Sequence, residues 1–288
     1  MSLKRDAALA ALALLWLTFG PIGEAVAANP VANADELVAR HLDSIASPAV
    51  RAGLKTRVVQ GLVHFRIVVG GAGALDGKAF LVSDGKKFQF MMKLPNTEYD
   101  GEQFIFDGQK HWVGFSTGRQ TRSAFGDFVL VQSVVIDEGL LGGVLSTAWP
   151  LLNLDEREAK VSFEGLQKVD GKELYRLSYL PHKSTDLKIE LYFDPETCRH
   201  VETVYSLIVE PTMVPSMRAQ ALQQQARHQL QEKFGDFTTV DGVTLPMHYN
   251  IHFSREQQSG RTVVSEWDMK GLNVSNTMPV DPRNFEVK

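Results

Sequence analysis

The sequence contains a single cysteine in 288 residues, and this scarcity restricts how an exported protein could be stabilised. Cys198 has no partner for an internal disulfide, so a fold outside the cytoplasm would depend on its hydrophobic core. Hydrophobic residues form 44% of the chain, which is enough for a sizeable core. A lone thiol is more typical of a small buried side chain than of a nucleophile.

A strong excess of charge is also missing. The formal net charge is −4, and no basic cluster stands out along the chain. Because nucleic acid binding requires a positive field that meets the phosphates, we expect no nucleic acid partner.

Sequence motifs of phosphate and metal binding are absent. The chain has no phosphate-binding glycine loop and no H-E-x-x-H pair. His248 and His252 share a strand face, but four residues at about 3.3 Å each separate them by ~13 Å, too far for one zinc ion. Asp194 and Thr197 are expected to cap a turn. We therefore predict no enzyme, no metal and no cofactor, although scattered serine, histidine and aspartate side chains leave hydrolysis open.

Long apolar runs are limited to one at the N-terminus. Lys4 and Arg5 precede an apolar run over residues 7–19, and small residues follow at 25–28. This pattern predicts a secretory signal peptide over residues 1–27, cleaved after Ala27 or Ala28, because the run is shorter than the ~20 residues of a membrane span. No cysteine lies there to carry a lipid anchor. We expect a soluble periplasmic protein made of residues 28–288.

The first element of the mature chain is expected to be an amphipathic helix. Asn33 is placed to be its N-cap, with Glu36 three residues later as in a capping box. The apolar stripe consists of Leu37, Val38, Leu42 and Ile45. The helix is expected to end near residues 48–53.

Alternating polar and apolar residues then predict strands in two meanders joined by an apolar segment. The first strand starts at Thr56, with Val59, Val63, Phe65 and Ile67 on one face. D-G pairs supply the tight turns. The other expected strands are 78–83, 88–93, 102–106, 111–115, 160–166, 172–180, 187–193, 200–207, 231–240, 243–253 and 262–269. We expect one or two helices over 128–152, and a loop or short helix over 209–228 that carries Met213 and Met217.

These elements predict an α+β fold, mainly β, in one domain. The expected architecture is a strongly curved antiparallel sheet, a half-barrel, covered on its concave face by a few helices, since so large a sheet curls. Its hollow can be filled by its own side chains, by the helices over 33–46 and 128–152, or by a ligand. The sequence leaves these alternatives open.

Several segments carry a resemblance to a known family. They are 170–181 (DGKELYRLSYLP), 188–197 (KIELYFDPET), 235–246 (GDFTTVDGVTLP) and the tail 273–285. Together with the N-terminal helix, they resemble the periplasmic outer-membrane lipoprotein-sorting (LolA-like) proteins. The resemblance implies a half-barrel whose apolar hollow takes acyl chains of a lipid or lipoprotein. It also implies a gating arginine, a role that we do not assign to Arg66.

Candidate ligand-binding residues alternate along three of the expected strands. The same residues equally suit the core face of a packed sheet, so only the set as a whole favours a pocket. They are Phe88, Phe90, Met92, Phe104, Phe106, Leu187, Ile189, Leu191 and Phe193.

The predicted function is that of an envelope carrier or chaperone that binds lipid or lipoprotein acyl chains in an apolar hollow. Inner- and outer-membrane proteins are its expected partners. The alternative is an envelope sensor or interaction module that contacts a membrane-protein partner.

Overall fold

The computed structural model describes residues 30–210 and 225–287. The predicted signal peptide lies outside these residues, as does the stretch with Met213 and Met217. No helix in the described part is long and apolar enough to cross a membrane.

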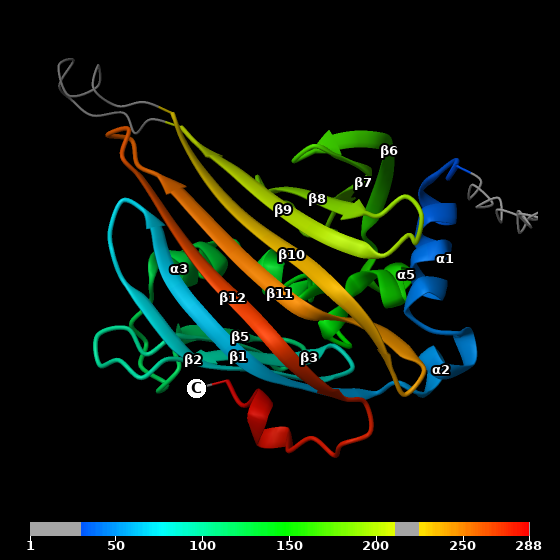
Figure 1. Cartoon of the computed structure of the whole chain (residues 1–288), viewed down its shortest axis with the longest axis horizontal. Coiled ribbons are helices and arrows are strands. Elements are labelled where there is room, and N and C mark those ends of the chain that lie inside the picture. The colour runs from blue at the N-terminus through cyan, green and yellow to red at the C-terminus, as the bar shows by residue number, and fades with distance from the viewer. Residues whose placement is uncertain (1–29, 211–224, 288) are drawn as a thin grey trace, which may run out of the picture.

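Twelve antiparallel strands form one open sheet, which confirms the predicted mainly β half-barrel (Figure 1). Their order is β5-β4-β3-β2-β1-β12-β11-β10-β9-β8-β7-β6, so the sheet has two free edges, β5 and β6. The strands of the first meander are β1 Thr56–Val69, β2 Ala74–Asp84, β3 Lys87–Lys93, β4 Glu102–Phe106 and β5 His111–Phe115. Those of the second are β6 Lys160–Val169, β7 Lys172–Leu180, β8 Lys188–Phe193, β9 His200–Val209, β10 Ala226–Val240, β11 Val243–Glu256 and β12 Thr262–Ser275.

The strand order explains how the hollow is filled. β5 and β6 are consecutive strands in the chain but lie at opposite edges of the sheet. The segment between them, residues 123–158, must therefore cross from one edge to the other, and we call it the plug segment. It contains α3 Ala124–Val131, α4 Val134–Asp137, η1 Gly143–Leu145, η2 Pro150–Asn153 and α5 Leu154–Arg157, and these lie behind the long strands in Figure 1.

The plug segment differs from the expected one or two helices over 128–152. It begins earlier, at Ala124, because the Ser123 hydroxyl caps α3 by accepting a hydrogen bond from the Gly126 amide. It is also broken into short α and 3₁₀ turns. Gly142 and Gly143 take left-handed backbone conformations with φ of +82° and +50°, which interrupt a continuous helix.

Helix α1 (Ala34–Ile45) lies at the other end of the molecule from α3 (Figure 1). The predicted N-cap is present, since Asn33 Oδ1 accepts from the Glu36 amide at 2.9 Å. The reciprocal bond of a capping box is shifted by one residue, because Glu36 Oε2 accepts at 2.9 Å from the amide of Ala32 and not from that of Asn33. The expected end near 48–53 is wrong. α1 stops at Ile45, and a separate helix, α2 (Pro48–Gly53), starts at the Ser47 cap with proline at its first position.

The cap at Asn33 gives a first prediction. Asn33→Ala is expected to lower the free energy of unfolding by about 1 kcal/mol, because the Glu36 amide loses its acceptor. Asn33→Gly should cost only a few tenths of that, since glycine is tolerated at an N-cap. Urea unfolding of the two variants measures the difference, and equal losses would contradict the capping role.

Alternation along the strands separates two faces. On β3 the side chains of Phe88, Phe90 and Met92 face the plug segment and are buried, while Met91 and Lys93 lie on the convex face. Several strands are longer than predicted. The clearest case is β10, which begins at Ala226 and not at residue 231. A short C-terminal helix, η3 (Pro282–Phe285), packs on the convex side of β3 and β4.

Candidate functional site

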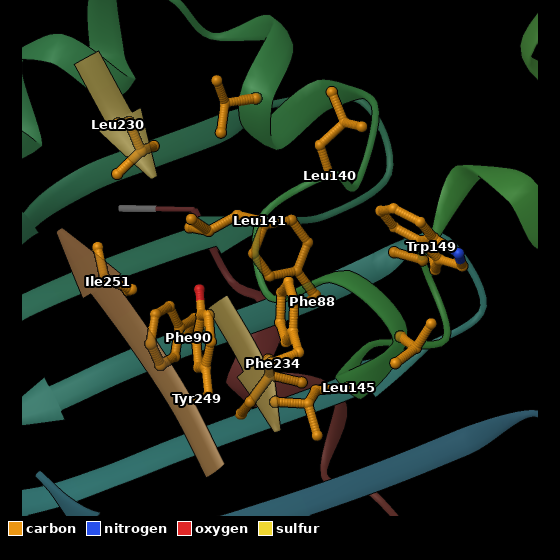
Figure 2. Close-up of a cluster of buried hydrophobic side chains, with 14 of the residues drawn as sticks. Phe88, Phe90, Leu140, Leu141, Leu145, Trp149, Leu230, Phe234, Tyr249 and Ile251 are labelled. Atoms are coloured by element: carbon orange, nitrogen blue, oxygen red, sulfur yellow. The ribbon is translucent and has the colours of Figure 1, made fainter. Parts of the chain in front are cut away.

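All nine predicted ligand-binding residues lie on the concave face, and each is at most 5% exposed. They share one buried cluster with plug residues such as Phe125, Leu141 and Trp149. Figure 2 shows Leu140, Leu141, Leu145 and Trp149 of the plug segment gathered with Phe88 and Phe90. In the described structure these nine residues are core, and their contact with a ligand stays a prediction.

The cavity in the middle of the filled hollow is small, with a volume of about 10 Å³ beside Phe90, Leu145 and Tyr249. This volume is close to the minimum for one water molecule, so a chain could enter here only where plug residues move aside.

Two buried polar groups of the sheet hold the middle of the plug segment. Arg57 of β1 is 2% exposed and donates to the carbonyl oxygen of Val144 and, at 2.7 Å, to Asn276 Oδ1. Glu232 of β10 is fully buried and accepts from the Gly142 amide at 2.8 Å and from the hydroxyls of Tyr205 and Tyr249. Burial raises the pKa of Glu232 to about 7, despite these hydrogen bonds.

His41 connects helix α1 to the plug segment. The Trp149 indole donates to His41 Nε2 at 3.1 Å, and His41 Nδ1 lies 3.1 Å from the carbonyl oxygen of Cys198. This arrangement requires the neutral ring, with its proton on Nδ1. Burial lowers the pKa of His41 to about 4, which favours the same form.

Open space lies at the opposite end of the hollow, on both sides of α3. The β1–β12 cleft has a volume of about 210 Å³, and the β9–β10 cleft about 330 Å³. Ala124 and Arg255 line both clefts. The β1–β12 cleft is also lined by Phe65, Ile67, Tyr99, Ser123, Phe125, Phe253, Val263, Ser265 and Trp267. The β9–β10 cleft is also lined by Asp127, Phe128, Val131, Gln132, Leu207, Val209 and His228.

Helix α3 is apolar on nearly all sides although part of it faces solvent. Phe125 and Phe128 pack against Phe253, with ring centroids 5.8 and 5.3 Å apart. Val131 at the end of the helix is 75% exposed. A helix that is apolar all round is normally covered, so the exposed side of α3 is a candidate binding surface. Further exposed aliphatic residues at the nearby strand ends are Val68, Val69 and Ile208.

One cation faces this open end. Arg255 is exposed, and within the described ranges its guanidinium forms no ion pair or hydrogen bond. Burial and the nearby Arg255 charge lower the pKa of His228, which favours the neutral ring. Asp127 pairs with Arg122 at 2.8 Å. Arg255 therefore carries the uncompensated charge between the two clefts.

A buried carboxyl group lies under the first turn of α3. Glu102 of β4 is fully buried, and its Oε1 accepts from the Tyr99 hydroxyl at 2.9 Å. The Trp267 indole in turn donates to the Tyr99 oxygen at 2.9 Å. Burial raises the pKa of Glu102 to about 7. This chain of hydrogen bonds fixes one wall of the β1–β12 cleft.

Sequence reasoning missed the residues at this open end. Arg255 continues the alternation of Tyr249, Ile251 and Phe253 on the concave face, and Glu232 likewise lies in phase with apolar neighbours. A charged residue at the end of, or inside, an apolar alternating pattern is the signal that could have identified both.

The other residues singled out in the sequence lie in turns, in the core or in pairs with neighbouring side chains. Asp194 Oδ1 accepts from the amide and hydroxyl of Thr197, both at 2.8 Å, which confirms the turn. Burial raises the pKa of the Cys198 thiol. His248 lies 2.5 Å from Asp268. In the described ranges, no group of three His, Cys, Asp or Glu residues is placed to hold a metal ion.

Arg66 lies on the convex face, away from the plug segment, and forms two hydrogen bonds with Glu266 at 3.0 and 3.1 Å. Arg57 of β1, in contrast, donates to the plug carbonyl of Val144.

The chain thus has the architecture of an open antiparallel half-barrel with a plugged hollow and apolar clefts at its mouth. No family model matches the sequence, and no curated protein matches it. Among solved structures, the chain shows likeness to a LolA superfamily protein from Nitrosomonas europaea, which is 14% identical, with 89% of this chain and 99% of that chain covered and a TM-score of 0.46.

Two further structures show weaker likeness. The MucA/MucB complex of Pseudomonas aeruginosa gives 10% identity over 82% of this chain and 93% of that one, with a TM-score of 0.25. A β-barrel-like protein of a domain of unknown function from Brucella abortus gives 13% identity over 77% and 98%, with a TM-score of 0.19.

Proposed function

We propose that this protein is a periplasmic carrier that binds the acyl chain of a lipid or lipoprotein at the open end of its hollow. The observation that carries the proposal is the pair of apolar clefts that flank the incompletely covered helix α3. Each buried methylene of a bound chain would contribute about 0.8 kcal/mol, so no chemical step and no cofactor are required.

Deeper entry of a chain would require displacement of the plug segment. Short helical turns, broken at Gly142 and Gly143, form this segment, and its middle is held by Arg57 and Glu232. Arg57 is the arginine of this chain that best suits a gating role, because its guanidinium donates to the Val144 carbonyl oxygen of the plug segment. The nine concave residues would line the hollow in an opened state.

A variant that fills the clefts tests the proposal. Ala124→Phe places a ring where both clefts meet, and we expect it to weaken binding of a fluorescent fatty acyl probe at least tenfold. Ala39→Phe, on the exposed side of α1, is the matched control and should bind like the wild type. Probe titration and thermal unfolding of each variant give affinity and fold integrity.

Mass spectrometry of organic extracts from protein purified out of its native envelope provides the second arm. A co-purifying lipid is expected. Absence of any lipid together with no probe uptake by the wild type would overturn the carrier proposal, and equal binding by Ala124→Phe would exclude the clefts.

A partner-binding function is the second candidate, supported by a groove on the convex face. This groove, of about 700 Å³, is lined by Leu62, Phe80, Met91 and Pro95, and Leu62 is 67% exposed. Lys78 and Lys93 of the same groove are directly opposite on β2 and β3, an unfavourable pairing that an acidic membrane-protein segment would relieve. A photo-crosslinker placed at Leu62 tests this candidate. Crosslinking to such a membrane-protein segment, together with no lipid in organic extracts of the purified protein, would favour it.

A further inference from the structure

The two clefts share one charged residue, Arg255, which suggests a ligand with one polar group and more than one acyl chain. Arg255 and Ala124 line each of them, and the first turn of α3 lies between the β1–β12 side and the β9–β10 side. A ligand whose polar group meets Arg255 could therefore extend one apolar branch into each cleft.

The volumes favour two branches over one. At about 210 and 330 Å³, each cleft lies near or below the lower end of the roughly 300–1,000 Å³ typical of small-molecule sites, while the two together fall within it. Aromatic walls are present on both sides, with Phe125 and Trp267 in one cleft and Phe128 in the other.

The charges favour an anionic polar group. Arg255 has no counter-ion in the described part of the chain, and the groups around it do not supply one. Asp127 is paired with Arg122, and a Glu256 carboxylate oxygen accepts from the Arg227 amide at 3.2 Å. His228 and Tyr99 are the remaining titratable groups that line these clefts.

We propose that Arg255 binds the phosphate of an anionic two-chain phospholipid, whose acyl chains occupy the β1–β12 and β9–β10 clefts. This inference rests on the proposed acyl-chain binding and specifies its ligand. The guanidinium suits a phosphodiester because its planar donors match two phosphate oxygens.

Calorimetric titration of the purified, delipidated protein with short-chain soluble lipids tests this. Dioctanoyl phosphatidylglycerol should bind at least tenfold more tightly than dioctanoyl phosphatidylcholine, which carries a compensating cation, and than single-chain lysophosphatidylglycerol. A tenfold ratio corresponds to about 1.4 kcal/mol. Glycerol 3-phosphate, an anionic phosphate without chains, should show no measurable binding.

Substitution of the arginine isolates its role. Arg255→Gln should weaken phosphatidylglycerol binding about tenfold and weaken phosphatidylcholine binding less, because the choline cation already offsets the phosphate charge. Arg227→Gln is the matched control, because Arg227 is an exposed arginine on the neighbouring strand and lines neither cleft. Both substituted side chains are exposed, so both variants are expected to fold.

The outcomes separate this inference from the function on which it rests. Equal affinity for the two diacyl lipids, or no effect of Arg255→Gln, would overturn the anionic-headgroup assignment while leaving acyl binding intact. Equal affinity for the single-chain lipid would overturn the two-chain assignment. No binding of any lipid would overturn the proposed function itself, and tight glycerol 3-phosphate binding would show a phosphate site without lipid recognition.

Discussion

Replacement of Trp149 by alanine is expected to destabilise the protein by about 3–5 kcal/mol, the cost of removing a large buried aromatic side chain. Trp149 is 1% exposed and joins three parts of the fold. It stacks on His200 with ring centroids 4.6 Å apart, donates to His41 of α1, and belongs to the plug segment. Its loss would open a cavity where the sheet, α1 and the plug segment meet.

A second substitution separates packing from hydrogen bonding at this site. Trp149→Phe keeps much of the ring but leaves His41 Nε2 without its donor, so a smaller loss of about 1–3 kcal/mol is expected. Urea unfolding of wild type and both variants measures the two effects. A loss below 1 kcal/mol for Trp149→Ala would show that the plug segment contributes little to the stability of the sheet.

The second large effect concerns pH. Burial raises the pKa of Glu232 from 4.5 to about 7, so the folded state holds this proton more tightly than the unfolded state does. The contribution of Glu232 to stability is therefore full below pH 4.5 and is lost as the pH rises through 7. Over this range the wild type should lose on the order of 3 kcal/mol relative to Glu232→Gln, which cannot ionise.

The comparison of variants is needed because other buried groups titrate in the same range. Burial also raises the pKa of Glu102 to about 7, and lowers the pKa of His41 to about 4, which acts in the opposite direction. Unfolding in urea at pH 5 and pH 8 gives the difference between wild type and Glu232→Gln. Exposed Glu173→Gln is the control and should parallel the wild type, whereas parallel curves for Glu232→Gln would contradict the prediction.

The fold was predictable to a large extent because most of its signals are local. The N-cap at Asn33 needs only residues three apart, and the exact bounds of β4, β5 and β7 followed from alternation and turn residues. Errors occurred where local signals conflict. The short helix at Pro48–Gly53 and the broken helices of the plug segment depend on caps and left-handed glycines, which the hydrophobic pattern does not reveal.

The candidate site was less predictable than the fold. Phe88 and Phe90 were placed on the concave face by their alternation, and they are there. What packs opposite them could not be read from that pattern, because a packed core and a ligand hollow both require apolar residues at every second position. The clefts at α3 combine residues from six separate elements and a loop, with no shared spacing in the chain.

By itself, therefore, the sequence determined most of the secondary structure, the curved mainly β architecture and which side chains of each strand face the hollow. Tertiary structure alone decided that the plug segment occupies the hollow, since this follows from β5 and β6 lying at opposite edges of the sheet. It also decided which polar residues matter. Glu232 and Arg255 are ordinary members of strands in sequence, and their chemistry depends on how much protein or solvent surrounds each charge.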